Sequence, residues 1–85
     1  MNATLILYIK PNCCLCEEAK DELRIALKET SFEIVEKNIL EDWTLYQLYK
    51  EAIPVLTCNG NEWFRLRFSA AELADKLQKL KSPVN

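Results

Sequence analysis

Three cysteines lie within four positions of this chain, in the stretch KPNCCLCEEAKDEL that runs from Lys10 to Leu23. Cys13 and Cys16 form a C-x-x-C pair directly after an apolar run, at the expected start of a helix. Unpaired backbone N–H groups at a helix start stabilise a thiolate, which is the reactive form of cysteine. A second thiol one turn further along can reach back and resolve a mixed disulfide. The pair therefore indicates thiol–disulfide exchange, and the alternative is a pair of small core residues.

The other two cysteines leave further alternatives open. Cys14 fills the first x of the motif, either in a functional role, as a third redox thiol or a tuner of Cys13, or as an exposed small residue. Cys58 follows Pro54 along a strand, so at ~3.3 Å per residue we expect it ~13 Å from the active-site end. That distance argues against a four-cysteine metal site and favours a buried small residue. A metal-binding protein that uses Cys13, Cys14 and Cys16 with a partner's thiol is the remaining rival.

Composition narrows the class of protein. We expect one domain, 1–85, because 49% hydrophobic and 28% charged residues are typical of a globular chain. The 11 basic and 13 acidic side chains are interspersed, and the net charge of −2 does not suggest nucleic-acid or membrane-surface binding. The chain contains no histidine, which excludes Cys–His and Ser–His–Asp catalysis and histidine-ligated zinc. The apolar run Leu5–Ile9 is too short for a signal core or a membrane span, so we expect a cytoplasmic protein.

Hydrophobic periodicity and turn residues predict the elements that position these thiols. In chain order they are a strand at 4–9 that is covered on both faces, a helix at 14–29, a strand at 32–37, a shorter helix at 40–51, strands at 54–58 and 61–68, and a helix from residue 70. Asn59-Gly60 predicts a tight type I′ hairpin between the last two strands. Ser69 and Glu72 form a capping box that opens the last helix.

Side-chain spacing also predicts which faces are buried. The last helix carries an apolar face of Ala70, Leu73, Ala74, Leu77 and Leu80. On the second helix, Trp43, Tyr46 and Tyr49 are expected to pack against the sheet. Trp63 and Phe64 are neighbours on one strand and are expected to point to opposite faces. The order β-α-β-α-β-β-α then gives an α/β fold, with a four-stranded mixed sheet flanked by helices.

Two segments carry a resemblance to a known family. Lys10–Cys16, after a strand, resembles the active-site segment of glutaredoxins, and Ala52–Val55, ahead of a hairpin, resembles the cis-proline motif of the thioredoxin fold. The match of spacing and element order covers residues 4–80, and the chain resembles small bacterial-type glutaredoxin-like proteins with a C-x-L-C active site and an Ile-Pro-Val segment. This resemblance implies a thioredoxin-like, glutaredoxin-type fold and a dithiol–disulfide oxidoreductase.

The resemblance also implies roles for individual residues. Cys13 attacks a substrate disulfide, Cys16 resolves the mixed disulfide, and Pro54 forms a cis-proline loop that faces them. Ile53 offers its backbone to an extended substrate or to glutathione, and Lys10 supports a thiolate or a glutathione carboxylate. Substrates are then protein or low-molecular-weight disulfides, and glutathione or a thioredoxin-type reductase supplies electrons to a monomer without a bound cofactor or metal.

One departure from the family bears on glutathione. Glutaredoxins that bind it well carry a Gly-Gly-x-Asp turn before the last helix, whereas residues 67–72 here are RFSAAE and Gly60 is the chain's one glycine. Ser69 and the helix start could still receive a carboxylate, but we expect weak glutathione binding. A non-catalytic interaction module that keeps the fold is a further alternative.

Overall fold

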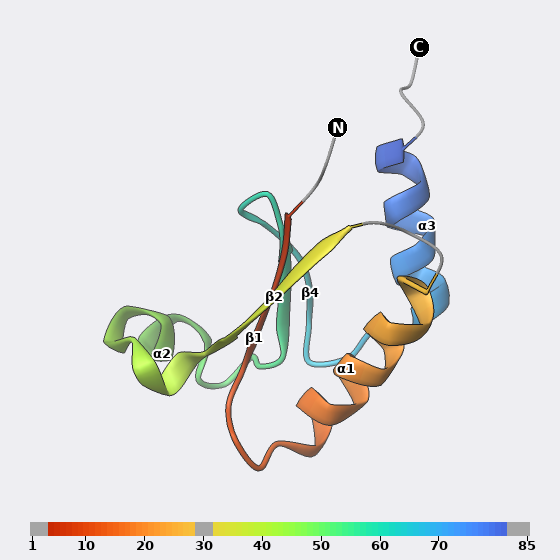
Figure 1. Cartoon of the computed structure of the whole chain (residues 1–85). Helices are drawn as coiled ribbons and strands as arrows, with labels where there is room; N and C mark the ends of the chain where they lie inside the picture. Colours follow the sequence, from red (N-terminus) through yellow and green to blue (C-terminus); the bar gives the residue numbers. More distant parts are fainter. Residues whose placement is uncertain (1–3, 29–31, 82–85) are drawn as a thin grey trace.

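Four strands form one mixed sheet in the computed structural model, which describes residues 4–28 and 32–81 (Figure 1). The elements are β1 (Thr4–Ile9), α1 (Cys14–Ala26), β2 (Glu33–Asn38), a 3₁₀ turn (Ile39–Glu41), α2 (Trp43–Tyr49), β3 (Val55–Cys58), β4 (Asn61–Arg65) and α3 (Ala70–Lys81). The strand order is β2-β1-β3-β4. β1 and β2 are parallel, and the other two neighbouring pairs are antiparallel. The predicted element order and mixed sheet are confirmed.

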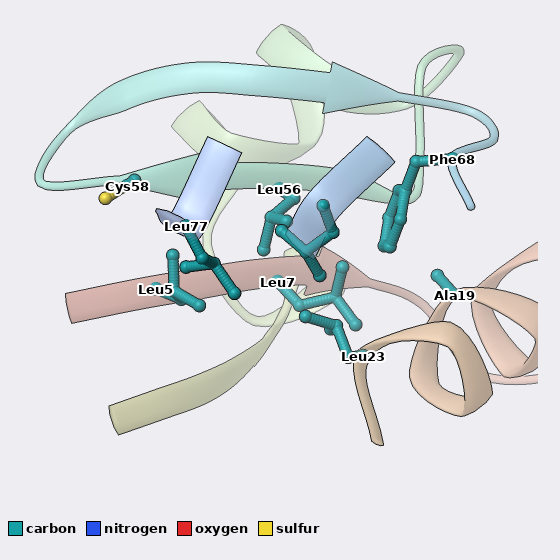
Figure 2. Close-up of a cluster of buried hydrophobic side chains, with 9 residues drawn as sticks. Leu5, Leu7, Ala19, Leu23, Leu56, Cys58, Phe68 and Leu77 are labelled. Atoms are coloured by element: carbon teal, nitrogen blue, oxygen red, sulfur yellow. The ribbon is translucent and has the colours of Figure 1, made fainter. Parts of the chain in front are cut away.

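The main core lies between the sheet and two helices. Figure 1 shows α1 and α3 on one side of the sheet and α2 on the other. Alternate residues of β1 point toward α1 and α3, and Figure 2 shows them meeting side chains of β3 and of both helices. The buried residues of this cluster are Leu5, Leu7, Ala19, Leu23, Leu56, Cys58, Phe68, Leu73 and Leu77. Each buried leucine stabilises the fold by roughly 1.5–3 kcal/mol relative to an exposed one.

The opposite face of the sheet is covered less completely than we expected. The Tyr8 ring of β1 packs against Tyr49 of α2, with 4.8 Å between the ring centroids. Further along the strand Ile6 is half-buried, and its register partner Val35 on the edge strand β2 is exposed. The seven residues of α2 cover this face only near the active-site end of β1. The prediction of burial on both faces therefore holds for only part of the first strand.

The second helix starts later than predicted, because two side chains cap successive turns. Asn38 accepts a hydrogen bond at the start of the 3₁₀ turn, and Asp42 accepts two at the start of α2. Such side chains favour helix starts over helix interiors. The predicted helix at 40–51 is therefore divided, and its regular part begins only after Asp42.

Trp43 does not pack against the sheet, and that part of the prediction is wrong. Its side chain is 73% exposed and stacks on Tyr46, with 5.9 Å between the centroids. Tyr46 and Tyr49 are half-buried and pack against the buried cluster that includes Cys16. The helix is short and begins directly at Trp43, so this residue lies beyond the covered part of the sheet.

The expectation that Trp63 and Phe64 lie on opposite faces is also wrong. The β3–β4 ladder shifts register between Leu56 and Thr57, which leaves one extra residue on β4. A β-bulge of this kind interrupts the strict alternation of side chains. Both rings are half-buried against the main core, and the Lys76 ammonium lies 5.4 Å and 5.8 Å from their centroids. Sequence alternation alone gives no sign of the bulge.

The turn and cap signals of the last three elements are confirmed. Asn59 and Gly60 have φ angles of 51° and 88°, as a type I′ turn requires. The Ser69 N–H donates to Glu72 Oε1 at 3.0 Å, and the Glu72 N–H donates to Ser69 Oγ at 3.1 Å. These reciprocal bonds are the predicted capping box.

The ends of two elements and the apolar face of a third differ from the prediction. β4 ends at Arg65 instead of residue 68, because Leu66 has a φ of 71° and turns the chain away from the sheet. α1 ends at Ala26, and residue 29 lies outside the described residues. On α3, Ala74 is exposed although we expected it on the apolar face, while the side chain of Leu80 is outside the described part.

Candidate active site

Cys13 is the N-cap of α1. Its backbone is extended, with φ −118° and ψ 111°, so the chain turns into the helix at this residue. The Cys16 N–H donates to Cys13 Sγ at 3.1 Å, and the Glu17 N–H donates to the Cys13 carbonyl at 3.1 Å. The thiol is half-buried and therefore still accessible. An N–H donor and the positive end of a helix both favour negative charge on a sulfur atom placed there.

Cys16 lies one turn further along and is 1% exposed. Burial, and after it the hydrogen bond with Cys13, raises the pKa of Cys16 from 9.0 to about 12. The backbone of Lys10 and the charge of Lys20 oppose this shift. Cys16 is therefore a protonated thiol at neutral pH, beside a more exposed sulfur.

A second buried cluster brings the C-x-x-C pair together with the proline loop. Its buried members are Cys16, Ile39 and Ile53, and its half-buried members are Tyr8, Ile9, Cys13, Leu45, Tyr46 and Tyr49. The Ile53–Pro54 peptide bond is cis, as the resemblance implied, and Pro54 is fully buried directly before β3. The structure thus places Cys13, Cys16 and Ile53 in one cluster.

The remaining predicted site residues lie at the rim of this cluster. Lys10 is exposed, and it is the backbone of Lys10 that acts on the Cys16 thiol. Cys14 is the first residue of α1 and is exposed, which is compatible with both roles considered for it.

Cys58 lies apart from the other thiols, in the main core. It is 3% exposed at the end of β3, and burial raises its pKa. Figure 2 shows it beside Leu5 and Leu77, at the opposite end of the cluster from Ala19. The prediction of a buried small residue is confirmed. In the described residues, no three histidine, cysteine or acidic side chains are grouped so that they could hold a metal ion.

One residue that shapes the neighbourhood of this site was missed by sequence reasoning. Glu22 of α1 accepts a hydrogen bond from the Ala70 N–H at 2.6 Å, and so caps α3 from another helix. Together with Glu72, which accepts from Ser69, it fills the helix start where we expected that a ligand carboxylate could bind. No local pattern announces this contact, because the two partners are 48 residues apart.

The fold and the motif agree with a known family. The model of the glutaredoxin-like domain (DUF836) matches residues 4–78. The chain belongs to this family. Its glutaredoxin-like domain is similar to protein XcR50 from X. campestris, with 28% identity, a TM-score of 0.74, and 93% of this chain and 99% of that chain covered. It is also similar to protein Ne2328 from Nitrosomonas europaea, with 28% identity, a TM-score of 0.75, and coverage of 87% and 89%.

A more distant similarity places the glutaredoxin-like domain among thioredoxin folds. Thioredoxin 1 from Thermosipho africanus matches with a TM-score of 0.66. The match covers 92% of this chain and 93% of that chain. At 14% identity this likeness shows the fold alone. The expected thioredoxin-like fold is thereby confirmed. Within residues 4–28 and 32–81, every helix is too short or too polar to cross a bilayer.

Proposed function

We propose that this glutaredoxin-like domain is a dithiol–disulfide oxidoreductase that reduces protein or mixed disulfides through Cys13 and Cys16. The observation that carries the proposal is the asymmetry of the two thiols. Cys13 is accessible at the start of α1 and accepts an N–H bond, whereas Cys16 is buried and holds its proton. An accessible nucleophile and a shielded resolving thiol are what two-step disulfide exchange requires.

The reaction consists of two exchanges at sulfur. The Cys13 thiolate attacks one sulfur of the substrate disulfide, the substrate S–S bond breaks, and one substrate thiolate leaves and takes up a proton. Cys16 then loses its proton and attacks Cys13 Sγ, which releases the second substrate thiolate and forms the Cys13–Cys16 disulfide. Two electrons pass from the dithiol to the substrate. An external thiol of the glutathione class, or a thioredoxin-type reductase, returns the pair to the dithiol in a reducing compartment such as the cytoplasm.

The proline loop supplies a docking edge for an extended substrate. The Ile53 N–H donates to the Tyr49 carbonyl at 3.2 Å and is therefore already used inside the fold. We therefore propose that only the Ile53 carbonyl pairs with a substrate N–H. The expected role of the Ile53 backbone is reduced to this one group. Lys10, exposed at the rim, supplies positive charge for a thiolate or carboxylate.

Glutathione is proposed as a possible electron donor but as a weak ligand. The amides of Ser69 and Ala70 already donate to Glu72 and Glu22. A glutathione carboxylate at this helix start would have to displace one of these side chains and would meet the other. Each charge-assisted hydrogen bond that is not formed costs about 1.5–3 kcal/mol, or about tenfold or more in affinity.

Steady-state turnover tests the proposal directly. A glutathione mixed disulfide and a protein disulfide such as insulin are compared, each with glutathione or with a thioredoxin reductase as the reducing system. Cys13→Ser should abolish reduction in every combination, and Cys16→Ser should trap a mixed disulfide on Cys13 that is visible by mass spectrometry. Cys58→Ala, which removes the distant core thiol, is the matched control and should keep turnover. A folded wild-type protein that reduces none of these disulfides would instead be a non-catalytic interaction module.

A further inference from the structure

A groove of about 500 Å³ lies between α1 and the segment that leads into α3. Its α1 wall starts at Leu15, inside the C-x-x-C motif, and continues to Glu22. The opposite wall is formed by residues 66–69, and Ala19 and Phe68 add apolar lining between the walls. The groove therefore begins at Leu15, within the C-x-x-C motif, and follows α1 away from it.

Two contacts join the walls of the groove. The Ala70 N–H donates to Glu22 Oε1 at 2.6 Å, and the Arg67 guanidinium lies 3.5 Å from the Glu18 carboxylate. Both contacts cross from α1 to the segment around the start of α3. Contacts within the folded chain therefore join the two walls of the groove.

Leu66 places an exposed apolar side chain at this groove. Its φ of 71° is uncommon for a residue with a large side chain. Its N–H donates to the carbonyls of Ala52 at 3.1 Å and Pro54 at 2.8 Å, which fixes it to the proline loop. The side chain is 44% exposed and lines the groove. The backbone of Leu66 is thus bound to the proline loop, while its side chain offers an apolar contact surface in the groove.

The charge of the groove selects the kind of ligand. Its charged lining consists of Glu18, Asp21, Glu22, Glu72 and Arg67. The side chains of Glu18 and Asp21 are 58% and 62% exposed, so their carboxylates are accessible from solvent. Arg67 pairs with Glu18, and Arg24, just outside the groove, pairs with Asp21. Four carboxylates against these two guanidinium groups leave a net negative charge, which favours a positively charged ligand and repels an anionic one such as glutathione.

We propose that this groove binds a basic peptide segment with apolar residues, which flanks the disulfide of a protein substrate. Its part in substrate choice rests on the proposed function, whereas its affinity for such a peptide does not. From Leu15 to Glu22 the helix rises about 10 Å, which is the length of about three extended residues. The basic residues therefore lie within about four positions of the reacting cysteine.

Peptide binding to the whole chain tests the groove independently of redox chemistry. The probes are two fluorescein-labelled nine-residue peptides with a central serine in place of cysteine. One carries lysines and leucines beside the serine, and the other carries glutamates in place of the lysines. Fluorescence anisotropy is measured at about 0.01 M and about 0.15 M salt, where the screening lengths are about 30 Å and 8 Å. The lysine peptide should bind at least about tenfold more tightly at low salt, and less so at the higher concentration.

Matched variants locate the binding site. Glu18→Gln with Asp21→Asn removes two groove charges and should weaken binding of the lysine peptide by roughly 5–20-fold, since each exposed ion pair contributes about 2–5-fold. Glu33→Gln with Asp75→Asn removes the same net charge from outside the groove and should change binding by less than about twofold. Equal affinity for both peptides, or an equal loss in both double variants, overturns the proposal.

A second experiment separates this inference from the proposed function. The central serine of each peptide is replaced by a cysteine that is held in a disulfide, and the rates at which the protein reduces the two disulfides are compared. Faster reduction of the lysine form supports both. Tight binding of the lysine peptide with no reduction of either disulfide supports the groove and overturns the redox function. Reduction of both forms at equal rates, with no difference in binding, overturns the groove and leaves the redox function standing.

Discussion

Two helix starts in this domain are filled in different ways. At the start of α1 a sulfur atom, Cys13 Sγ, accepts the N–H of Cys16 and is still accessible. At the start of α3 two carboxylates, Glu72 and Glu22, accept the N–H groups of Ser69 and Ala70. Both arrangements satisfy amides that a helix leaves unpaired. The first uses a group that can react, and the second uses groups that can only stabilise. One helix start therefore presents an accessible sulfur atom, and at the other the amides of Ser69 and Ala70 are occupied by carboxylates of the chain itself.

The largest effect is expected at the start of α1, where the two thiols should differ in their reactivity. With a pKa of about 12, roughly one Cys16 in 10⁵ is a thiolate at neutral pH. Cys13 has no such burial and faces the helix start. Brief alkylation of the reduced protein with iodoacetamide, followed by peptide mapping, should label Cys13 at least about a hundredfold faster than Cys16. Preferential labelling of Cys16 would contradict the assignment of nucleophile and resolving thiol.

The resolving step should depend steeply on pH. The thiolate fraction of Cys16 rises about tenfold for each pH unit below its pKa of about 12. A mixed disulfide between Cys13 and a chromogenic aromatic thiol should therefore release that thiol about tenfold faster per unit between about pH 6 and 9. Stopped-flow absorbance measures the release, and Cys16→Ser provides the blank. A rate that is flat over this range would mean that another group removes the Cys16 proton.

Buried thiols should also weaken the fold at alkaline pH. Below the ordinary thiol pKa of 9.0, Cys16 is protonated in both the folded and the unfolded chain, and its contribution is fully present. Between 9.0 and about 12 the unfolded chain loses this proton while the folded chain keeps it, so stability falls as the pH rises. Burial shifts the pKa of Cys58 and Tyr49 in the same direction.

Urea unfolding at about pH 8 and about pH 10.5 measures this loss. In Cys16→Ala the fall in the free energy of unfolding should be shallower by up to ~1.4 kcal/mol per pH unit. Cys16→Ala also places a smaller side chain in a buried position, which changes its stability at every pH. The change in stability of each protein is therefore measured relative to its own value at pH 8. If the free energy of unfolding falls equally with pH in both proteins, the Cys16 proton does not contribute to the pH dependence of stability.

Local signals in the sequence predicted much of this fold and the thiol at the start of α1, but they did not predict that Glu22 caps α3. The C-x-x-C pair, the Asn59-Gly60 turn and the capping box at Ser69 each act within a few residues, so their structure follows from local chemistry. The misplaced aromatic Trp63 depends on a bulge between strands, and the exposure of Trp43 depends on how far α2 extends over the sheet. These are properties of tertiary packing, which periodicity in one segment does not contain.

The smallest effect, and the one that tests the occupied helix start, is expected from Glu22. Glu22→Ala removes the acceptor of the Ala70 N–H and should lower the free energy of unfolding by about 1–2 kcal/mol, the usual cost of a lost helix cap. Glu22→Gln keeps an oxygen acceptor and should lose less. Asp21→Asn, on the same turn of α1 but paired with Arg24 at the surface, is the control and should change stability by less than about 0.5 kcal/mol.

The same variant should also change what the start of α3 can receive. Without the Glu22 carboxylate, the Ala70 N–H is free to donate a hydrogen bond to an anionic ligand, although Glu72 still accepts from the neighbouring Ser69 amide. Glutathione should then bind a few-fold more tightly to Glu22→Ala than to the wild type, measured by calorimetry with the reduced protein. Unchanged affinity together with unchanged stability would show that the 2.6 Å contact neither holds the helix start nor closes it. A stability loss without a gain in affinity would leave Glu72 as the group that excludes the ligand, and Glu72→Gln in the Glu22→Ala background would then be the variant that opens the site.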